Sequence, residues 1–155
     1  MLLGIEELDL FVKVLIAGLL GFAVGLEREL MGSAAGDRTF ALVAIGSALF
    51  TVLSADAFGS AGDAPGRVAA NIVTGVGFLG GGMILKEGGT VRGLTTAAGI
   101  WATAAVGMAV GTDRYLLGVL TTLLIGVVFA AERVYSIKRR QPIAAPPESA
   151  TANEK

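Results

Sequence analysis

Apolar residues dominate five long stretches of this chain, and the charged residues fall between them. The uncharged runs between successive charges are 13, 17, 18, 20 and 17 residues long. A helix that crosses the hydrocarbon core of a membrane needs about 20 mostly apolar residues, within a range of about 17–25. The last four runs reach that range, and the first does so if Lys13 extends its amine toward the membrane surface. The pattern predicts five membrane-spanning helices, at residues 8–27, 39–57, 68–86, 94–112 and 115–132.

Composition supports a membrane protein over a soluble one. Hydrophobic residues make up 54% of the chain, charged residues 16%, and the mean hydropathy is +0.73. A soluble domain would show polar stripes at helical spacing, and the third and fifth stretches show almost none. We expect an all-α fold, a polytopic bundle of about five transmembrane helices over residues 1–135. Segment 136–155 buries too little apolar surface to fold and is predicted to be a disordered cytoplasmic tail.

The placement of lysine and arginine predicts the orientation of the bundle. Five spans put the two termini on opposite sides, and cytoplasmic loops carry the basic excess. We therefore expect the N-terminus outside and the C-terminus in the cytoplasm. The cytoplasmic side would carry Arg28, Arg38, Lys86, Arg92, Arg133, Lys138, Arg139 and Arg140, and the outer side Lys13, Arg67 and Arg114.

The chain contains neither histidine nor cysteine. Their absence excludes a Ser-His-Asp triad and leaves no ordinary ligand set for zinc. No Ser–Lys pair falls within a span, so we expect no enzyme. The formal net charge of −1 offers no basic excess for binding nucleic acid. Carboxylates, arginines and backbone carbonyls remain as the chemistry available to the chain.

Small residues recur at four-residue steps inside three of the spans. Such steps place the small residues on one helix face, where another backbone can approach closely. We expect these stripes to be helix-packing seams, and they would also allow a homo-oligomer. They are Ala17, Gly21 and Gly25, then Gly77 and Gly81, then Gly107 and Gly111.

The third span carries a wider cluster of glycines, at Gly75, Gly77, Gly80, Gly81 and Gly82. Its segment 75–80 matches G-x-G-x-x-G, but a dinucleotide site requires a preceding strand and a βαβ unit, which an uncharged run of 18 residues does not offer. Three consecutive glycines weaken a helix. Two alternatives stay open for Gly80 to Gly82: a kink, or a breach whose exposed carbonyls line a polar cavity.

The junction between the first two spans is the most informative polar feature. Glu27 and Arg28 close the first span, and Asp37, Arg38 and Thr39 open the second. One alternative is that these charges only mark where the helices leave lipid, with Glu27–Arg38 or Arg28–Asp37 paired. The other is a functional polar vestibule, in which Glu27 and Asp37 carry a proton or ligate a cation. Mg²⁺ is the candidate cation, and no other cofactor is expected.

Further polar side chains fall within the third and fourth spans. Arg67 and Asn71 are four residues apart and share one helix face, while Thr95 and Thr96 open the fourth span. We expect these four side chains to point inward, with Asn71 hydrogen-bonded between helices. Trp101 lies deep in its span and is expected to be a packing residue.

Taken in order, the motifs of the chain resemble those of the MgtC/SapB membrane protein family. They are G-L-E-R-E at 25–29, A-G-D-R-T at 35–39, R-V-A-A-N at 67–71, G-V-G-F-L-G at 75–80, and V-R-G-L-T-T-A-A at 91–98 with W-A at 101–102. The resemblance covers about residues 10–131. The chain departs from the family pattern at Asp37, Asn71 and Gly81, and it resembles a short form that lacks the C-terminal cytoplasmic regulatory domain.

The resemblance implies a bacterial inner (plasma) membrane protein linked to magnesium limitation, stress adaptation and, in pathogens, survival inside host cells. Some members resemble regulators of other membrane complexes, including the proton-driven ATP synthase. Two functions follow. The favoured one is modulation of a membrane protein complex or of membrane energetics, in contact with membrane lipid. The other is a transporter or channel for a cation such as Mg²⁺, against which the scarcity of acidic residues deep in the spans counts.

Overall fold

The computed structural model describes residues 2–58, 64–87 and 89–139. These residues form five helices and one short hairpin, which confirms the predicted all-α bundle. The elements are α1 (Leu2–Leu30), α2 (Asp37–Phe58), α3 (Ala64–Gly82), β1 (Leu85–Glu87), β2 (Thr90–Arg92), α4 (Leu94–Gly111) and α5 (Tyr115–Arg139). α5 continues past the predicted boundary at 135, and the rest of the predicted tail lies outside the described residues.

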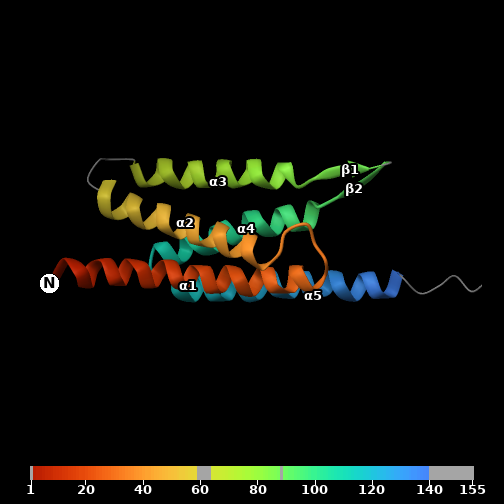
Figure 1. The fold of residues 1–155 in the computed structure, drawn as a ribbon, viewed down its shortest axis with the longest axis horizontal. Helices are drawn as coiled ribbons and strands as arrows, with labels where there is room; N and C mark the ends of the chain where they lie inside the picture. The colour runs from red at the N-terminus through yellow and green to blue at the C-terminus, as the bar shows by residue number, and fades with distance from the viewer. Residues whose placement is uncertain (1, 59–63, 88, 140–155) are drawn as a thin grey trace, which may run out of the picture.

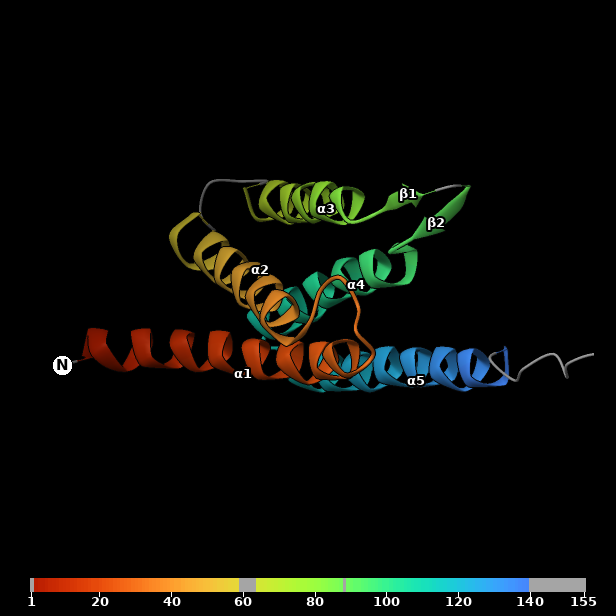
Figure 2. The ribbon, with the colours of Figure 1, turned by 45° about the vertical axis from the view of Figure 1, so that its right-hand side comes forward.

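The helices form three layers (Figure 1). α1 and α5 lie side by side in the first layer, α2 and α4 cross in the middle, and α3 lies on the far side with the hairpin at its end, as the turned view also shows (Figure 2). α2 and α4 both pack against α1, and α3 packs against α4 and α2. Consecutive helices run in opposite directions, so α1 begins at one end of the bundle and α5 finishes at the other.

Four of the described helices are long and apolar enough to cross a membrane, which makes the chain a multi-pass membrane protein. They cover Gly4–Leu30, Asp37–Asp56, Leu94–Gly111 and Tyr115–Glu132, close to the first, second, fourth and fifth predicted spans. The third predicted span also forms a helix, α3, but it is not among the four. Its six glycines, together with Arg67 and Asn71, lower its hydropathy.

α3 stops at Gly82, four residues before the predicted end of the third span, because the chain turns into a hairpin. The backbone N–H of Met83 donates to the Gly80 carbonyl at 3.1 Å, so the glycine run finishes the helix. Strands β1 and β2 then pair antiparallel. Gly89 joins them with a φ of +88°, which glycine adopts readily in tight hairpin turns. These strands were not predicted, because the segments on either side of Gly-Gly are three residues long and each contains one apolar residue, which is too short to show the alternation that marks a strand.

Two of the three predicted glycine seams are filled by a neighbouring helix. A Cβ atom placed on Gly21 of α1 would lie 2.6 Å from the carbonyl oxygen of Phe40, and one on Gly25 would lie 2.6 Å from the backbone at the start of α2. A Cβ atom on Gly111 of α4 would lie 2.9 Å from the carbonyl oxygen of Ala48. The backbones of α1 and α4 therefore press directly on α2, as closely packed membrane helices do.

The third predicted seam is open. A Cβ atom on Gly77 or Gly81 would meet no atom within 4 Å, and the neighbouring Phe78 is 84% exposed. This surface faces away from the rest of the bundle. We call it the outer face of α3, and its residues are Ala70, Thr74, Gly77, Phe78 and Gly81.

Candidate functional site

A buried arginine joins the two helices of the first layer. Arg28, in the last turn of α1, is only 3% exposed. Its Nε lies 2.7 Å from Glu27 Oε2, and its Nη1 lies 2.8 Å from Glu132 Oε2 on α5. The guanidinium also lies 3.9 Å from the centre of the Phe129 ring, in a cation–π contact. We call Glu27, Arg28, Phe129 and Glu132 the arginine cluster.

Helix spacing and a glycine on α4 position the α5 side of the arginine cluster. Phe129 and Glu132 are three residues apart and share one helix face. The Phe129 ring meets the Phe40 ring of α2 edge to face, with centroids 6.3 Å apart. A Cβ atom on Gly99 would collide with Phe129, so glycine is needed there. Contacts from α2 and α4 thus hold the Phe129 ring, against which Arg28 packs.

The arginine cluster has a formal charge of −1 and is not fully hydrogen-bonded. It contains two carboxylates and one guanidinium, and both Glu27 Oε1 and Arg28 Nη2 are buried without a partner. A buried polar atom left unpaired costs about 1–3 kcal/mol. The cluster could therefore accept a proton, a water molecule or a small cation, and its net charge disfavours an anion.

The structure brings together only part of the predicted polar junction. Glu27 and Arg28 belong to the arginine cluster, but neither predicted pair, Glu27–Arg38 or Arg28–Asp37, occurs among the ion pairs of the described residues. Asp37 begins α2, and its Oδ1 accepts a hydrogen bond from the Arg38 backbone N–H at 2.6 Å. The side chains of Arg38 and Thr39 are exposed. Both predicted pairings are therefore wrong, because α5 supplies the second carboxylate instead.

Glu132 and Phe129 were not among the residues predicted for the site, and Glu132 served only to mark the end of the fifth predicted span. One signal was available, since helices that alternate in direction put the end of the first span and the end of the fifth on the same side of the membrane. That signal places Glu132 level with Arg28, but it does not reveal that α1 and α5 are neighbours.

A second ion-pair group lies in the first half of α1, against the α4–α5 turn. Lys13 is buried, and its Nζ lies 2.8 Å from Asp113 Oδ1 in the α4–α5 turn and 3.5 Å from Asp9 Oδ2. Hydrogen bonds from Lys13 and from the Tyr115 hydroxyl hold the pKa of the Asp113 carboxyl below its usual value. Because the bonded form is the carboxylate, this contribution to stability is complete at neutral pH and is lost as the pH falls through the lowered pKa.

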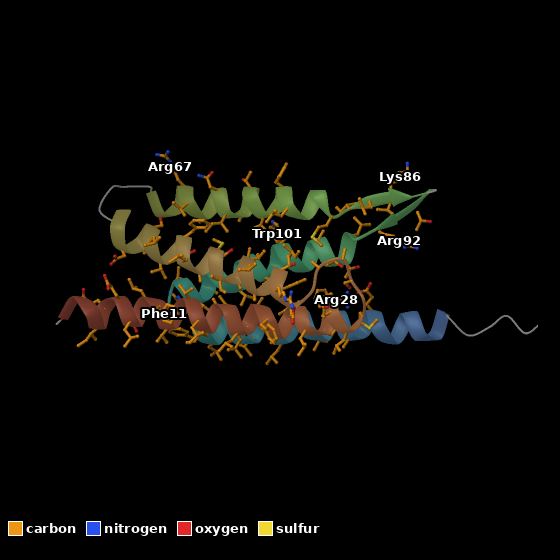
Figure 3. All side chains as sticks on the ribbon, viewed as in Figure 1. Phe11, Arg28, Arg67, Lys86, Arg92 and Trp101 are labelled. Carbon is orange, nitrogen blue, oxygen red and sulfur yellow. The ribbon has the colours of Figure 1, made fainter. Side chains whose placement is uncertain are left out.

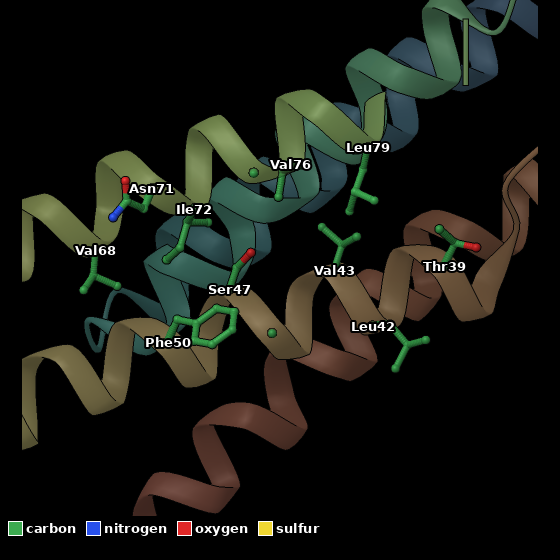
Figure 4. A pocket seen from close by; sticks show the side chains of 12 residues that line it. Thr39, Leu42, Val43, Ser47, Phe50, Val68, Asn71, Ile72, Val76 and Leu79 are labelled. Carbon is green, nitrogen blue, oxygen red and sulfur yellow. The ribbon is translucent and has the colours of Figure 1, made fainter. Parts of the chain in front are cut away.

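The polar side chains expected to point inward divide into two groups. Thr96 is buried and Thr95 is half-buried, as predicted. Arg67 is exposed, so the inward expectation is wrong for it, and Figure 3 shows it projecting away from the bundle. Asn71 is exposed but lines the groove between α3 and α2 (Figure 4), without the expected hydrogen bond to another helix among the described residues. Trp101 is half exposed on α4 instead of packed in the core.

The described residues contain no group of three or more His, Cys, Asp or Glu side chains that could hold a metal ion. Glu27 and Glu132, which share Arg28, are one pair of carboxylates that a metal ion could be tested against. Mg²⁺ is usually bound through one or two carboxylates and several retained waters. Here one oxygen of each carboxylate already contacts Arg28, so a divalent cation bound to the free oxygen of Glu27 would lie next to the positive guanidinium, which opposes its binding.

Comparisons with known proteins relate the chain to one family of membrane proteins. The sequence profile of the MgtC family matches residues 14–136. The putative magnesium transporter YhiD of Escherichia coli K12 is 42% identical over 130 residues, which cover 78% of this chain and 60% of YhiD.

Other relatives are similarly close. Protein MgtC of Salmonella typhimurium LT2 is 44% identical over 113 residues, covering 73% of this chain and 48% of its own length. The uncharacterized protein slr0014 of Synechocystis is 44% identical over 124 residues, which cover 80% of this chain and 52% of slr0014. The chain thus spans about half to three-fifths of the length of these relatives. No solved structure matches it significantly.

Proposed function

Because this chain belongs to the MgtC family, we propose that it is an inner-membrane protein of magnesium homeostasis that modulates a membrane partner. It acts by contact, in adaptation to magnesium limitation or stress, and carries out no catalytic step. The proposal concerns this chain alone, since the relatives extend well beyond the matched region.

The outer face of α3 is the observation that carries this proposal. The glycine stripes of α1 and α4 are covered by α2, whereas the stripe of the same spacing on α3 is uncovered. In a membrane, small residues at this spacing let a second helix approach closely enough for extensive van der Waals contact. A partner helix would complete the third seam at Gly77 and Gly81, with Phe78 as an apolar contact beside it.

The ion pairs support modulation over transport. Arg28 joins α1 to α5, and Lys13 joins α1 to the α4–α5 turn. The two basic residues are about 22 Å apart along the helix. Each is already paired with carboxylates, so they brace the two ends of the bundle instead of forming a continuous path of ionisable groups, as transport pathways usually do.

Photo-cross-linking in cells grown at low Mg²⁺ tests the proposal. A photoreactive residue at Thr74, on the outer face of α3, is expected to cross-link one discrete membrane protein. The same residue at Leu123, which is exposed on α5, should not. A Cβ atom on Gly77 meets no neighbour within 4 Å, so Gly77→Leu places its side chain on the outer face of α3 and should remove both the cross-link and growth at low Mg²⁺. A Gly77→Leu variant that still supports growth like the wild type would contradict the proposal.

A cation transporter or channel is the second candidate function, and the relative YhiD is named as a putative magnesium transporter. The observation that favours it is the unpartnered Oε1 of Glu27 inside a cluster of net charge −1. Such an oxygen could bind a proton or a cation transiently while it crosses the membrane. Modulation is preferred because Arg28 already neutralises one of the two carboxylates.

We also propose that the N-terminus is outside and the C-terminus cytoplasmic. Lys86 and Arg92 lie at one end of the bundle and Arg67 at the other (Figure 3), and basic residues favour the cytoplasmic side. Because the chain has no cysteine, single cysteines report their location cleanly. A membrane-impermeant maleimide should label Arg114→Cys in intact spheroplasts and Ala34→Cys only after lysis. The reverse labelling pattern would refute this orientation.

A further inference from the structure

The β1–β2 hairpin projects from one end of the bundle. Figures 1 and 2 show it extending past the neighbouring ends of α3 and α4. Leu85 of β1 is 56% exposed and Val91 of β2 is 46% exposed, and the side chains of Lys86 and Arg92 are exposed as well. The hairpin therefore presents two aliphatic and two cationic side chains to its surroundings.

Cross-strand pairing distributes these side chains over both faces of the hairpin. Leu85 lies opposite Arg92, and Lys86 lies opposite Val91. Directly opposite residues of an antiparallel pair share a face, and successive residues of a strand alternate between faces. One face therefore combines Leu85 with Arg92, and the other combines Val91 with Lys86. A protein docked on the hairpin would cover one face, whereas a layer of lipid headgroups surrounds both.

The two strands lie at the level of the lipid headgroups. The spanning stretch of α4 begins at Leu94, two residues after Arg92 ends β2. A headgroup layer is about 5–8 Å thick, and a three-residue strand covers about 7 Å. The pair nearest the hydrocarbon is Leu85 with Arg92, and the pair nearest the turn is Glu87 with Thr90. All the aliphatic and basic residues of the strands thus occupy the two pairs closest to the hydrocarbon, and the one acidic residue lies farthest from it.

The α4–α5 turn, at the opposite end of α4, has a different composition. It consists of Thr112, Asp113 and Arg114, so it offers no aliphatic side chain to the lipid. The combination of aliphatic and basic residues therefore belongs to the hairpin and is not repeated in that turn.

We propose that the hairpin docks in a headgroup layer of anionic phospholipid. Lys86 and Arg92 contact lipid phosphates, with their apolar stems along the membrane, while Leu85 and Val91 lie against the upper part of the acyl chains. Each basic side chain near an anionic lipid surface favours this contact by about fivefold. Because the hairpin joins α3 to α4, the contact anchors the adjoining ends of both helices.

Depth measurements with a spin label on the full chain test this assignment. Since the chain has no cysteine, Val91→Cys carries a single nitroxide, whose apolar ring takes the place of the valine side chain. The protein is reconstituted into vesicles of phosphatidylcholine alone or of an equal mixture of phosphatidylcholine and phosphatidylglycerol. Electron paramagnetic resonance then measures how often the label collides with a neutral, water-soluble nickel chelate. Both leaflets have the same composition, so the result does not depend on which side the hairpin faces.

The label should be at least about fivefold less accessible to the chelate in the vesicles that contain phosphatidylglycerol. Replacing both hairpin cations, by Lys86→Gln with Arg92→Gln, should remove this difference. Arg114→Gln is the matched control, because it removes a cation from the α4–α5 turn instead. It should leave the protection unchanged, and circular dichroism should show all variants equally helical.

Equal accessibility in the two vesicle types would overturn the proposal, and so would full protection of the label after both hairpin cations are removed. Protection that appears in phosphatidylcholine alone and rises with protein density would also overturn it, because a second copy of the chain would then cover the hairpin.

Discussion

Replacing Arg28 with alanine is expected to destabilise the folded bundle by about 3–5 kcal/mol, the usual cost of breaking a buried ion pair by removing one partner. The variant leaves the Glu27 and Glu132 carboxylates facing each other without their shared cation, and it uncovers the Phe129 ring. In a domain of this size that loss corresponds to a fall in melting temperature of about 6–20 °C. Thermal unfolding in detergent micelles, followed by circular dichroism, measures it.

Arg38→Ala is the matched control for this prediction. Arg38 is exposed at the start of α2, so its removal should change stability by no more than about 0.5 kcal/mol. Adding Glu132→Gln to Arg28→Ala should recover part of the loss, because one uncompensated charge disappears. Equal melting temperatures for Arg28→Ala and Arg38→Ala would show that the arginine cluster does not hold α1 to α5.

The second large effect is expected at the seam between α1 and α2. Gly21→Ala adds a Cβ atom 2.6 Å from the Phe40 carbonyl oxygen and 2.7 Å from the Ala44 Cβ, so the two helices must move apart. Overpacking of this kind costs about 1–3 kcal/mol. Alanine raises intrinsic helix stability by about 1 kcal/mol over glycine, and the clash should outweigh that gain.

Gly77→Ala controls for helix propensity, since it makes the same change where no atom lies within 4 Å. It should leave the isolated protein unchanged or up to about 1 kcal/mol more stable. The measurement is the difference in melting temperature between the two variants in the same detergent. If Gly21→Ala is as stable as Gly77→Ala, the backbones of α1 and α2 do not approach each other at Gly21 as closely as described.

The spans and two of the seams were predictable because they depend on local spacing. Uncharged runs of membrane-spanning length located both ends of α2 and α4 within two residues and located the first residue of α5. Small residues repeated at four-residue steps identified Gly21 and Gly111 as positions where a neighbouring backbone, here that of α2, approaches closely. Each of these inferences needs only the period of a helix and the apolar thickness of a membrane, and both are independent of which helices become neighbours.

The arginine cluster was not predictable to the same degree because it depends on tertiary neighbours. Arg28 was singled out, but its partner Glu132 is 104 residues away and is chosen by the packing of α1 against α5. The nearer Asp37 was the wrong choice, since it begins α2 and bonds to its own backbone instead. Arg67 was misplaced for a related reason: helical spacing groups it with Asn71, which lines the groove between α3 and α2, but does not say that Arg67 itself stays exposed.

Magnesium flux in reconstituted vesicles most directly tests the central claim, that this chain modulates a partner and does not carry the ion. Purified protein is placed in vesicles that contain a Mg²⁺-sensitive dye, and external Mg²⁺ is added with and without a proton gradient. We predict an influx equal to that of protein-free vesicles, and the same value for Glu27→Gln. A saturable Mg²⁺ influx that depends on the protein and is lost in Glu27→Gln would contradict the claim and assign the arginine cluster to transport.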